Sequence, residues 1–209
     1  MKRIWQAFVY YILLFSFLSL WGISLSGCKN PFKTRNSPPP IVSEGTWETP
    51  ARPEIVIQNL LYAYNEKIIG NFIQCLCDSF RFSAPEDSID AVNQGRADLF
   101  AYWDRAVEIS VTTGIFNTAR QKPDSLSYML SIHSTPPVPD EVDDTMAVLC
   151  RDYELVIFDH NDTSPDTAKG TATFHMRQTS LNWWSIYFLS DIPAETGKDD
   201  WADFKAKFR

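Results

Sequence analysis

Apolar residues recur at two spacings along this chain, and the change between them separates a helical part from a sheet-forming part. Over 53–64 they recur every three or four residues, which predicts an amphipathic helix that starts at Pro53. The same spacing predicts a short helix over 71–78 and another from the N-cap Asp104 to about residue 116. Residues 80–83 alternate and predict a brief strand, whereas the polar stretch 86–98 predicts a loop with one helical turn at most.

After residue 123 the apolar spacing changes to two, which is typical of strands with one buried face. Short polar turns separate the alternating segments, so neighbouring strands should pair antiparallel. A short helix is predicted at 200–205. The fold class is therefore α+β, with one domain over 53–209: a curved antiparallel sheet of about four to five strands packs against about three N-terminal helices. The predicted strands are 128–132, 147–157, 171–177 and 183–189.

The N-terminus has the layout of a secretory signal. Lys2 and Arg3 precede an apolar run from Ala7 to Leu25. The following stretch 28–52 is rich in proline and poor in large apolar residues, which predicts an extended tether. The run is also long enough to cross a bilayer, so an uncleaved signal anchor is the alternative to a cleaved peptide.

The sequence Leu25-Ser26-Gly27-Cys28 at the end of this run resembles a bacterial lipoprotein signal. The resemblance implies that residues 1–27 are a signal peptide and that Cys28 becomes the lipidated first residue of the mature protein. Acyl chains on Cys28 would anchor the protein to the membrane. Lys29 stands where an Asp would retain some lipoproteins in the inner membrane, so the expected location is the periplasmic face of the outer membrane.

The net charge of the chain argues against some classes of binding partner. Loss of residues 1–27 removes only two of the 19 Lys and Arg and leaves all 26 Asp and Glu, which gives a net charge of −9. Such an acidic protein is a poor match for nucleic acid or for electrostatic adsorption to an anionic membrane.

Three cysteines remain after Cys28. Cys75 and Cys77 are too close along a helix to pair with each other easily, and their spacing has no companion ligands for a metal. Buried free thiols are the favoured interpretation, while a disulfide from one of them to Cys150 stays open.

Four short segments of the chain resemble the nuclear-transport-factor-two-like (NTF2-like, cystatin-like) superfamily, which includes polyketide-cyclase-like domains. They are 59–65 (NLLYAYN), 75–82 (CLCDSFRF), Trp184-x-Ile186 and the end from Trp201 through Phe204 and Lys205. The resemblance covers about residues 53–191, and the last two segments resemble lipoprotein members of unknown role. It implies a cone-shaped α+β domain with a pocket between its helices and its sheet.

Enzymes of this superfamily place acidic, histidine, tyrosine or arginine side chains in that pocket. An isomerase or hydrolase would here use Asp78 or Asp152 as general base and Tyr153 to orient the substrate. However, Asp152 and Tyr153 are consecutive on a predicted strand, so only one can face the pocket. No metal or cofactor motif occurs, and we expect neither. The full set of candidates is Asp78, His133, Asp152, Tyr153, His175 and Asp191, of which the histidines are better explained as solvated surface residues.

A set of aromatic residues can either line a ligand cavity or fill a core. Trp183 and Trp184 must point to opposite sheet faces, and an exposed aromatic strand face would suit a homodimer formed through the sheet. The favoured hypothesis is a tethered envelope protein whose domain binds a small apolar ligand or another protein without catalysis; the enzyme described above is the alternative. The candidate pocket-lining residues are Tyr62, Phe82, Trp103, Tyr153, Phe174 and Trp184.

Overall fold

The computed structural model describes residues 45–123, 126–159 and 164–209. The predictions for the signal segment, Cys28 and the tether before residue 45 lie outside these residues. Within the described part of the chain, no helix is both long and apolar enough to cross a membrane.

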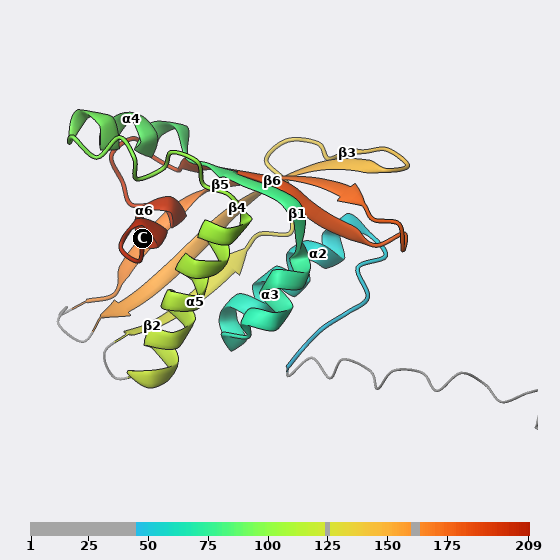
Figure 1. Cartoon of the computed structure of the whole chain (residues 1–209), viewed down its shortest axis with the longest axis horizontal. Coiled ribbons are helices and arrows are strands. Elements are labelled where there is room, and N and C mark those ends of the chain that lie inside the picture. The colour runs from blue at the N-terminus through green and yellow to red at the C-terminus, as the bar shows by residue number, and fades with distance from the viewer. Residues whose placement is uncertain (1–44, 124–125, 160–163) are drawn as a thin grey trace, which may run out of the picture. The chain divides into compact units, whose positions relative to one another are not determined.

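Three helices cover one face of the sheet (Figure 1). The first, α2 (Pro53–Glu66), starts at Pro53 as predicted, where the missing N–H of proline costs nothing. It is followed by α3 (Ile69–Cys75). The third, α5 (Arg105–Gln121), is capped by Asp104, whose carboxylate accepts hydrogen bonds from the N–H groups of Ala106 and Val107. The predicted amphipathic helices are therefore confirmed.

The sheet has six strands in the order β1-β6-β5-β4-β2, with β3 paired to β4 beside β2. The long strand β4 has room for two short neighbours on one edge, because β2 pairs with its second half and β3 with its first residues. All pairings are antiparallel except that of β1 with β6. The strands are β1 (Leu76–Ser83), β2 (Leu126–Ile132), β3 (Glu141–Val142), β4 (Met146–Asp159), β5 (Asp166–Gln178) and β6 (Trp184–Pro193).

The structure corrects three sequence predictions. Residues 86–98 are not mainly loop, because Pro85–Asn93 forms the helix α4 at one end of the sheet (Figure 1). The first strand starts at Leu76, so the short helix before it ends earlier than predicted. This strand is also parallel to β6 rather than antiparallel. In each case a tertiary contact decided the local structure: α4 packs on β6, and β1 completes the sheet edge.

The segment before α2 is tied to that helix. The side chain of Asn59, buried on α2, accepts a hydrogen bond from the Glu48 N–H (2.9 Å) and donates one to the Glu48 carbonyl (2.7 Å). The Thr46 N–H donates to Glu66 at the other end of the helix. The three cysteines of the domain, Cys75, Cys77 and Cys150, are free, so no disulfide joins them.

Gly170 lets two chain segments approach closely at the centre of the sheet. A Cβ added there would lie 2.5 Å from the Ile192 carbonyl oxygen and 2.5 Å from the Tyr153 hydroxyl. Both neighbours are fixed, since one is backbone and the other a hydrogen-bonded side chain in the core.

We therefore expect Gly170→Ala to lower the free energy of unfolding by about 1–3 kcal/mol, the usual cost of overpacking. Gly114→Ala is the matched control, because a Cβ on this α5 residue meets only Phe208 at ordinary contact distance (3.7 Å). In a helix that exchange should raise stability by about 0.5–1 kcal/mol. Urea unfolding of both variants measures the difference, and an equally stable Gly170→Ala protein would contradict the close approach.

Candidate functional site

The C-terminal helix α6 (Trp201–Ala206) fills the inside of the cone. It lies between α5 and the sheet (Figure 1). Its N-cap Asp200 and its residue Asp203 form a capping box, in which each side chain accepts a hydrogen bond from the backbone N–H of the other. The side chains of Trp201 and Phe204 are at most 2% exposed and belong to the main core. The protein's own helix thus occupies the place where the resemblance implies a ligand pocket.

A buried ion pair joins α6 to α5. Lys205 Nζ lies 2.8 Å from Glu108 Oε1, and the two side chains are 0% and 1% exposed. The second carboxylate oxygen, Oε2, accepts a hydrogen bond from Trp103 Nε1 at 2.7 Å. The ammonium also lies over the rings of Phe82 (4.0 Å) and Trp201 (4.8 Å). Because each charge is paired and further contacted, the pair can exist in the core without an unmatched charge.

The first N–H groups of α6 bind a second pair of polar side chains. Tyr153 on β4 donates its hydroxyl to Asp191 Oδ1 on β6 (2.8 Å) and accepts a hydrogen bond from the Trp201 N–H (2.8 Å). Asp191 Oδ2 accepts from the Ala202 N–H at 2.9 Å. The start of a helix leaves such N–H groups unsatisfied, so these contacts anchor α6 at its N-terminal end.

A third anchor comes from α2. The Trp201 indole N–H donates to the Tyr64 hydroxyl at 2.8 Å, and the two rings meet edge to face at 5.1 Å. Tyr64 also packs edge to face on Phe116 of α5 at 5.2 Å. Trp201 therefore contacts two elements that line the cone, α2 through Tyr64 and β4 through Tyr153.

Burial changes the acidity of these groups. It raises the pKa of Asp191 to about 7, against the lowering effects of the Tyr153 hydrogen bond and the Lys205 charge. It also raises the pKa of Tyr153 and of Tyr64 well above the ordinary value, so both stay neutral. An aspartate with a pKa near 7 is suited to act as a general base, but both oxygens of Asp191 are bound to protein groups. The arrangement serves to hold α6.

The two carboxylates predicted as general bases lie outside the cone. The side chain of Asp78 is fully exposed, 4.0 Å from Arg105. Asp152 is half-buried on the opposite sheet face and accepts a hydrogen bond from Thr171 Oγ1 at 2.7 Å. The structure therefore brings together Tyr153 and Asp191, but neither Asp78 nor Asp152. His133 is exposed as expected, and His175 lies half-buried against Tyr187 and Phe188 on the outer sheet face.

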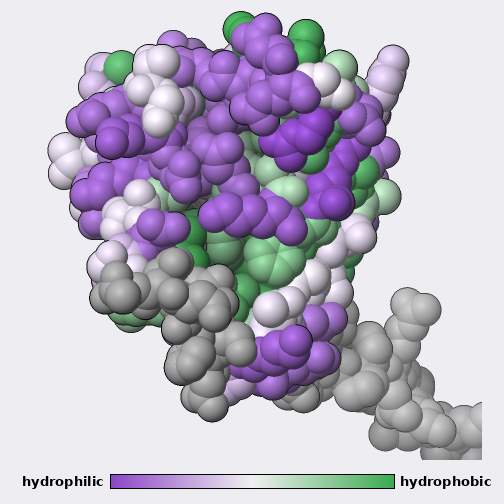
Figure 2. All heavy atoms as spheres, turned by 90° about the vertical axis from the view of Figure 1, so that its left-hand side faces the viewer, coloured by the Kyte–Doolittle hydropathy of each residue, from purple (hydrophilic) through white to green (hydrophobic). Residues whose placement is uncertain are grey.

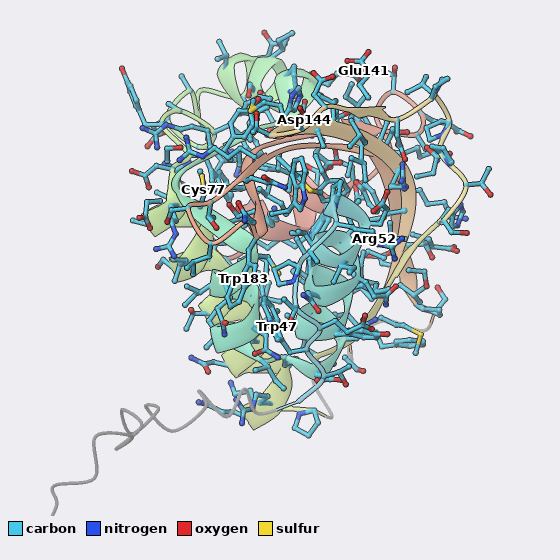
Figure 3. All side chains as sticks on the ribbon, turned by 90° about the vertical axis from the view of Figure 1, so that its right-hand side faces the viewer. Trp47, Arg52, Cys77, Glu141, Asp144 and Trp183 are labelled. Atoms are coloured by element: carbon cyan, nitrogen blue, oxygen red, sulfur yellow. The ribbon has the colours of Figure 1, made fainter. Side chains whose placement is uncertain are left out.

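Five of the six candidate lining aromatics lie in the core. They are Phe82, Trp103, Tyr153, Phe174 and Trp184, each at most 6% exposed. Tyr62 is half-buried on α2 and lies outside the core. Of the adjacent tryptophans only Trp184 is buried, as predicted. Trp183 is 43% exposed at the end of the molecule opposite α6 (Figure 3).

Hollows on the surface of the described residues include three that lie near the helices. One of 180 Å³ lies between α2 and the sheet edge, lined by Ile57, Leu61, His133 and Arg151 among others. One of 160 Å³ lies between α4 and α6 and is strongly acidic. The third, 510 Å³, is a shallow and mostly charged depression beside Asp104 and Arg105. Neither of the first two reaches the roughly 300 Å³ at which small-molecule sites begin.

The acidic hollow adjoins a cluster of three aspartates. Carboxylate oxygens of Asp87 on α4, Asp200 and Asp203 all lie within 4.8 Å of one another. Burial and then the neighbouring aspartates raise the pKa of Asp87 to about 7, and burial followed by the Asp191 charge does the same for Asp200. Hydrophilic residues dominate this end of the molecule around α4 (top of Figure 2).

Sequence reasoning missed Glu108, Lys205 and Tyr64, although a signal existed for each of them. Glu108 interrupts the apolar stripe that continues through Val111 and Ile115 of α5, and Lys205 lies one turn from Trp201 on the buried face of α6. Opposite charges on two apolar helix faces indicate a buried pair. For Tyr64 the signal was helical spacing, because it lies four residues after Leu60 on the apolar face of α2 and Tyr62 does not.

Removal of one partner of the buried pair should be costly. We expect Lys205→Met to lower the free energy of unfolding by about 3–5 kcal/mol, because Glu108 stays buried without its counter-charge. The double variant with Glu108→Gln should lose less than Lys205→Met alone. Urea unfolding of the wild type, Lys205→Met, Glu108→Gln and the double variant measures these losses. Lys169→Met, which breaks the exposed pair with Glu154, should cost at most about 1 kcal/mol, and simple additivity of the two core substitutions would contradict the coupling.

No protein-family model matches this sequence, and no curated protein is significantly similar to it. Solved structures are similar in fold. A conserved protein from Planctomyces limnophilus superposes with a TM-score of 0.50 at 10% identity, over 67% of this chain and 91% of that one. A candidate aromatic ring hydroxylase from Novosphingobium aromaticivorans superposes with a TM-score of 0.50 at 11% identity, over 68% of this chain and 87% of that one. An NTF2-like superfamily protein from Salmonella enterica superposes with a TM-score of 0.49 at 15% identity, over 70% of this chain and 94% of that one. At such identities the likeness concerns the fold alone, and the α+β architecture expected from the sequence is confirmed.

Proposed function

We propose that this protein is a lipid-anchored envelope protein whose NTF2-like domain binds a protein partner and carries out no chemistry inside its cone. One observation carries the proposal: α6 occupies the cone, and its N–H groups donate to Asp191 Oδ2 and to the Tyr153 hydroxyl, which in turn donates to Asp191 Oδ1. These are the groups of the cone that a substrate would otherwise meet. With α6 in place, a small apolar ligand has no room there either.

The outer face of the sheet, opposite the helices, is the surface best suited to the partner. Across its middle strands the ring of His175 packs edge to face on Tyr187 and Phe188, and all three are half-buried. Next to them on the same face, Thr173 and Cys150 are small, half-buried and in contact. Partly exposed aromatic rings are enriched at the centres of protein interfaces. We propose a second copy of the chain as the partner.

The alternative, an isomerase or hydrolase with a pocket carboxylate, finds little support. Asp78 and Asp152 would have to act from the exposed surface or from the outer sheet face. Asp191 has a suitable pKa of about 7 but would need α6 to leave the cone.

The dimer is tested by the molecular mass of residues 45–209, measured by light scattering after gel filtration. We expect a dimer that Phe188→Glu converts to a monomer, because a charge at the centre of a face-to-face contact is desolvated without a partner. Val92→Glu is the control, since Val92 is 58% exposed on α4, away from this face. A monomeric wild-type protein, or equal effects of both substitutions, would refute the proposed interface.

The anchor is tested in cells. Cys28→Ser should abolish incorporation of radiolabelled palmitate and move the protein from the membrane to the soluble fraction or leave it unprocessed, because the thiol is the acceptor of the lipid. Cys150→Ser, which alters a half-buried thiol of the sheet, should behave as the wild type. A Cys28→Ser protein processed and localised like the wild type would rule out lipidation and favour the uncleaved signal anchor.

A further inference from the structure

Three carboxylates from two elements converge at the junction of α4 and α6. Asp87 lies in the first turn of α4, Asp200 precedes α6 and Asp203 lies in its first turn. One oxygen of each lies within 4.8 Å of the others. Oxygens bound to one calcium ion at about 2.3–2.6 Å are at most about 5 Å apart, so this spacing fits a single coordination sphere.

A second observation concerns unmet hydrogen-bonding capacity. Asp200 is 0% exposed, yet its Oδ2 has no hydrogen-bond partner. Its other oxygen already accepts from the Asp203 N–H at 3.0 Å. Asp87 Oδ2 is likewise buried and receives no hydrogen bond from an N–H or O–H group, and the side chain that Asp87 meets is the carboxyl group of Asp200. A buried carboxylate oxygen left unpaired is costly, and here two such oxygens belong to the same cluster.

The surroundings can complete a coordination shell. The adjoining hollow of 160 Å³ is also lined by Glu86, Asp90 and Asp199, against the cations Arg96 and Lys198. At about 30 Å³ of liquid volume for each water, it can hold an ion and several waters. Three carboxylates plus waters form an oxygen-only ligand set, which hard divalent cations prefer.

We propose that Asp87, Asp200 and Asp203 bind a divalent cation of the calcium type, which joins α4 to α6. Calcium accepts about six to eight oxygen ligands in a flexible geometry, whereas magnesium requires a near-ideal octahedron at about 2.0–2.1 Å, so three carboxylates on two separate helices suit calcium better. The bound ion would neutralise the repulsion between the three aspartates and hold the N-terminal end of α6 at the mouth of the cone. This site is independent of the partner surface on the outer sheet face.

The test uses the full chain, extracted in a non-ionic detergent, stripped with EDTA and titrated with calcium chloride. We expect saturable binding by calorimetry and a rise in the midpoint of thermal unfolding. Asp87→Asn should weaken calcium binding at least tenfold, and it should raise the midpoint of the metal-free protein because it removes a repelling charge. Asp90→Asn, a neighbouring acidic residue of the hollow but not of the cluster, should change the affinity less than twofold.

A second measurement does not depend on variants. Terbium should bind the stripped protein and luminesce on excitation of tryptophan, since Trp201 directly follows Asp200, and calcium should displace it. Absence of calcium binding at millimolar concentration would overturn the proposal, as would equal losses in Asp87→Asn and Asp90→Asn. Tighter binding of magnesium would overturn the assignment to calcium. A protein stabilised by lower pH but not by calcium would indicate instead that the aspartates share a proton.

Discussion

A lysine ammonium without any exposed surface requires a counter-charge within contact distance, because a buried unpaired charge costs several kcal/mol. In the part of the chain that the structure describes, Glu108 is the carboxylate that forms an ion pair with Lys205, at 2.8 Å. This pair fixes the position of α6 relative to α5. Lys205 lies against the rings of Phe82 and Trp201. Because α6 has only six residues, fixing Lys205 also places Trp201 and Ala202 at the other end of the helix.

The consequence for function comes from the other end of the same helix. With Lys205 in place, the first N–H groups of α6 point at Tyr153 and Asp191 and satisfy them. A carboxyl group with a raised pKa beside a tyrosine is an arrangement that a cone-shaped enzyme could use for proton transfer. Here the same chemistry stabilises a helix terminus. A perturbed pKa therefore indicates burial in this site, and the bonding of the oxygens shows that the group is not available to a substrate.

The sequence predicted the elements whose pattern is decided locally. The start of α2 at Pro53, the Asp104 cap and the alternation along β4 and β5 depend on residues close together in the chain. By contrast, α4 is a mostly polar helix with only Ala91 buried, so it resembled a loop in the sequence, and β1 depends on pairing with the distant β6. The interior of the cone was equally hard to predict. Trp201 and Phe204 were recognised as a terminal helix, but only the folded chain shows that this helix turns inward.

The N-terminal end of α6 combines two opposing electrostatic effects. Its dipole and free N–H groups favour negative charge, which explains why Asp200 and Asp203 form a capping box and why Asp191 is tolerated in the core. These favourable contacts use only part of each carboxylate. Asp87 approaches from α4, and its buried Oδ2 accepts no hydrogen bond from the N–H groups of α6. The excess negative charge at this junction is therefore too large for the helix terminus alone, and either protons or a cation must compensate it for α4 and α6 to remain together.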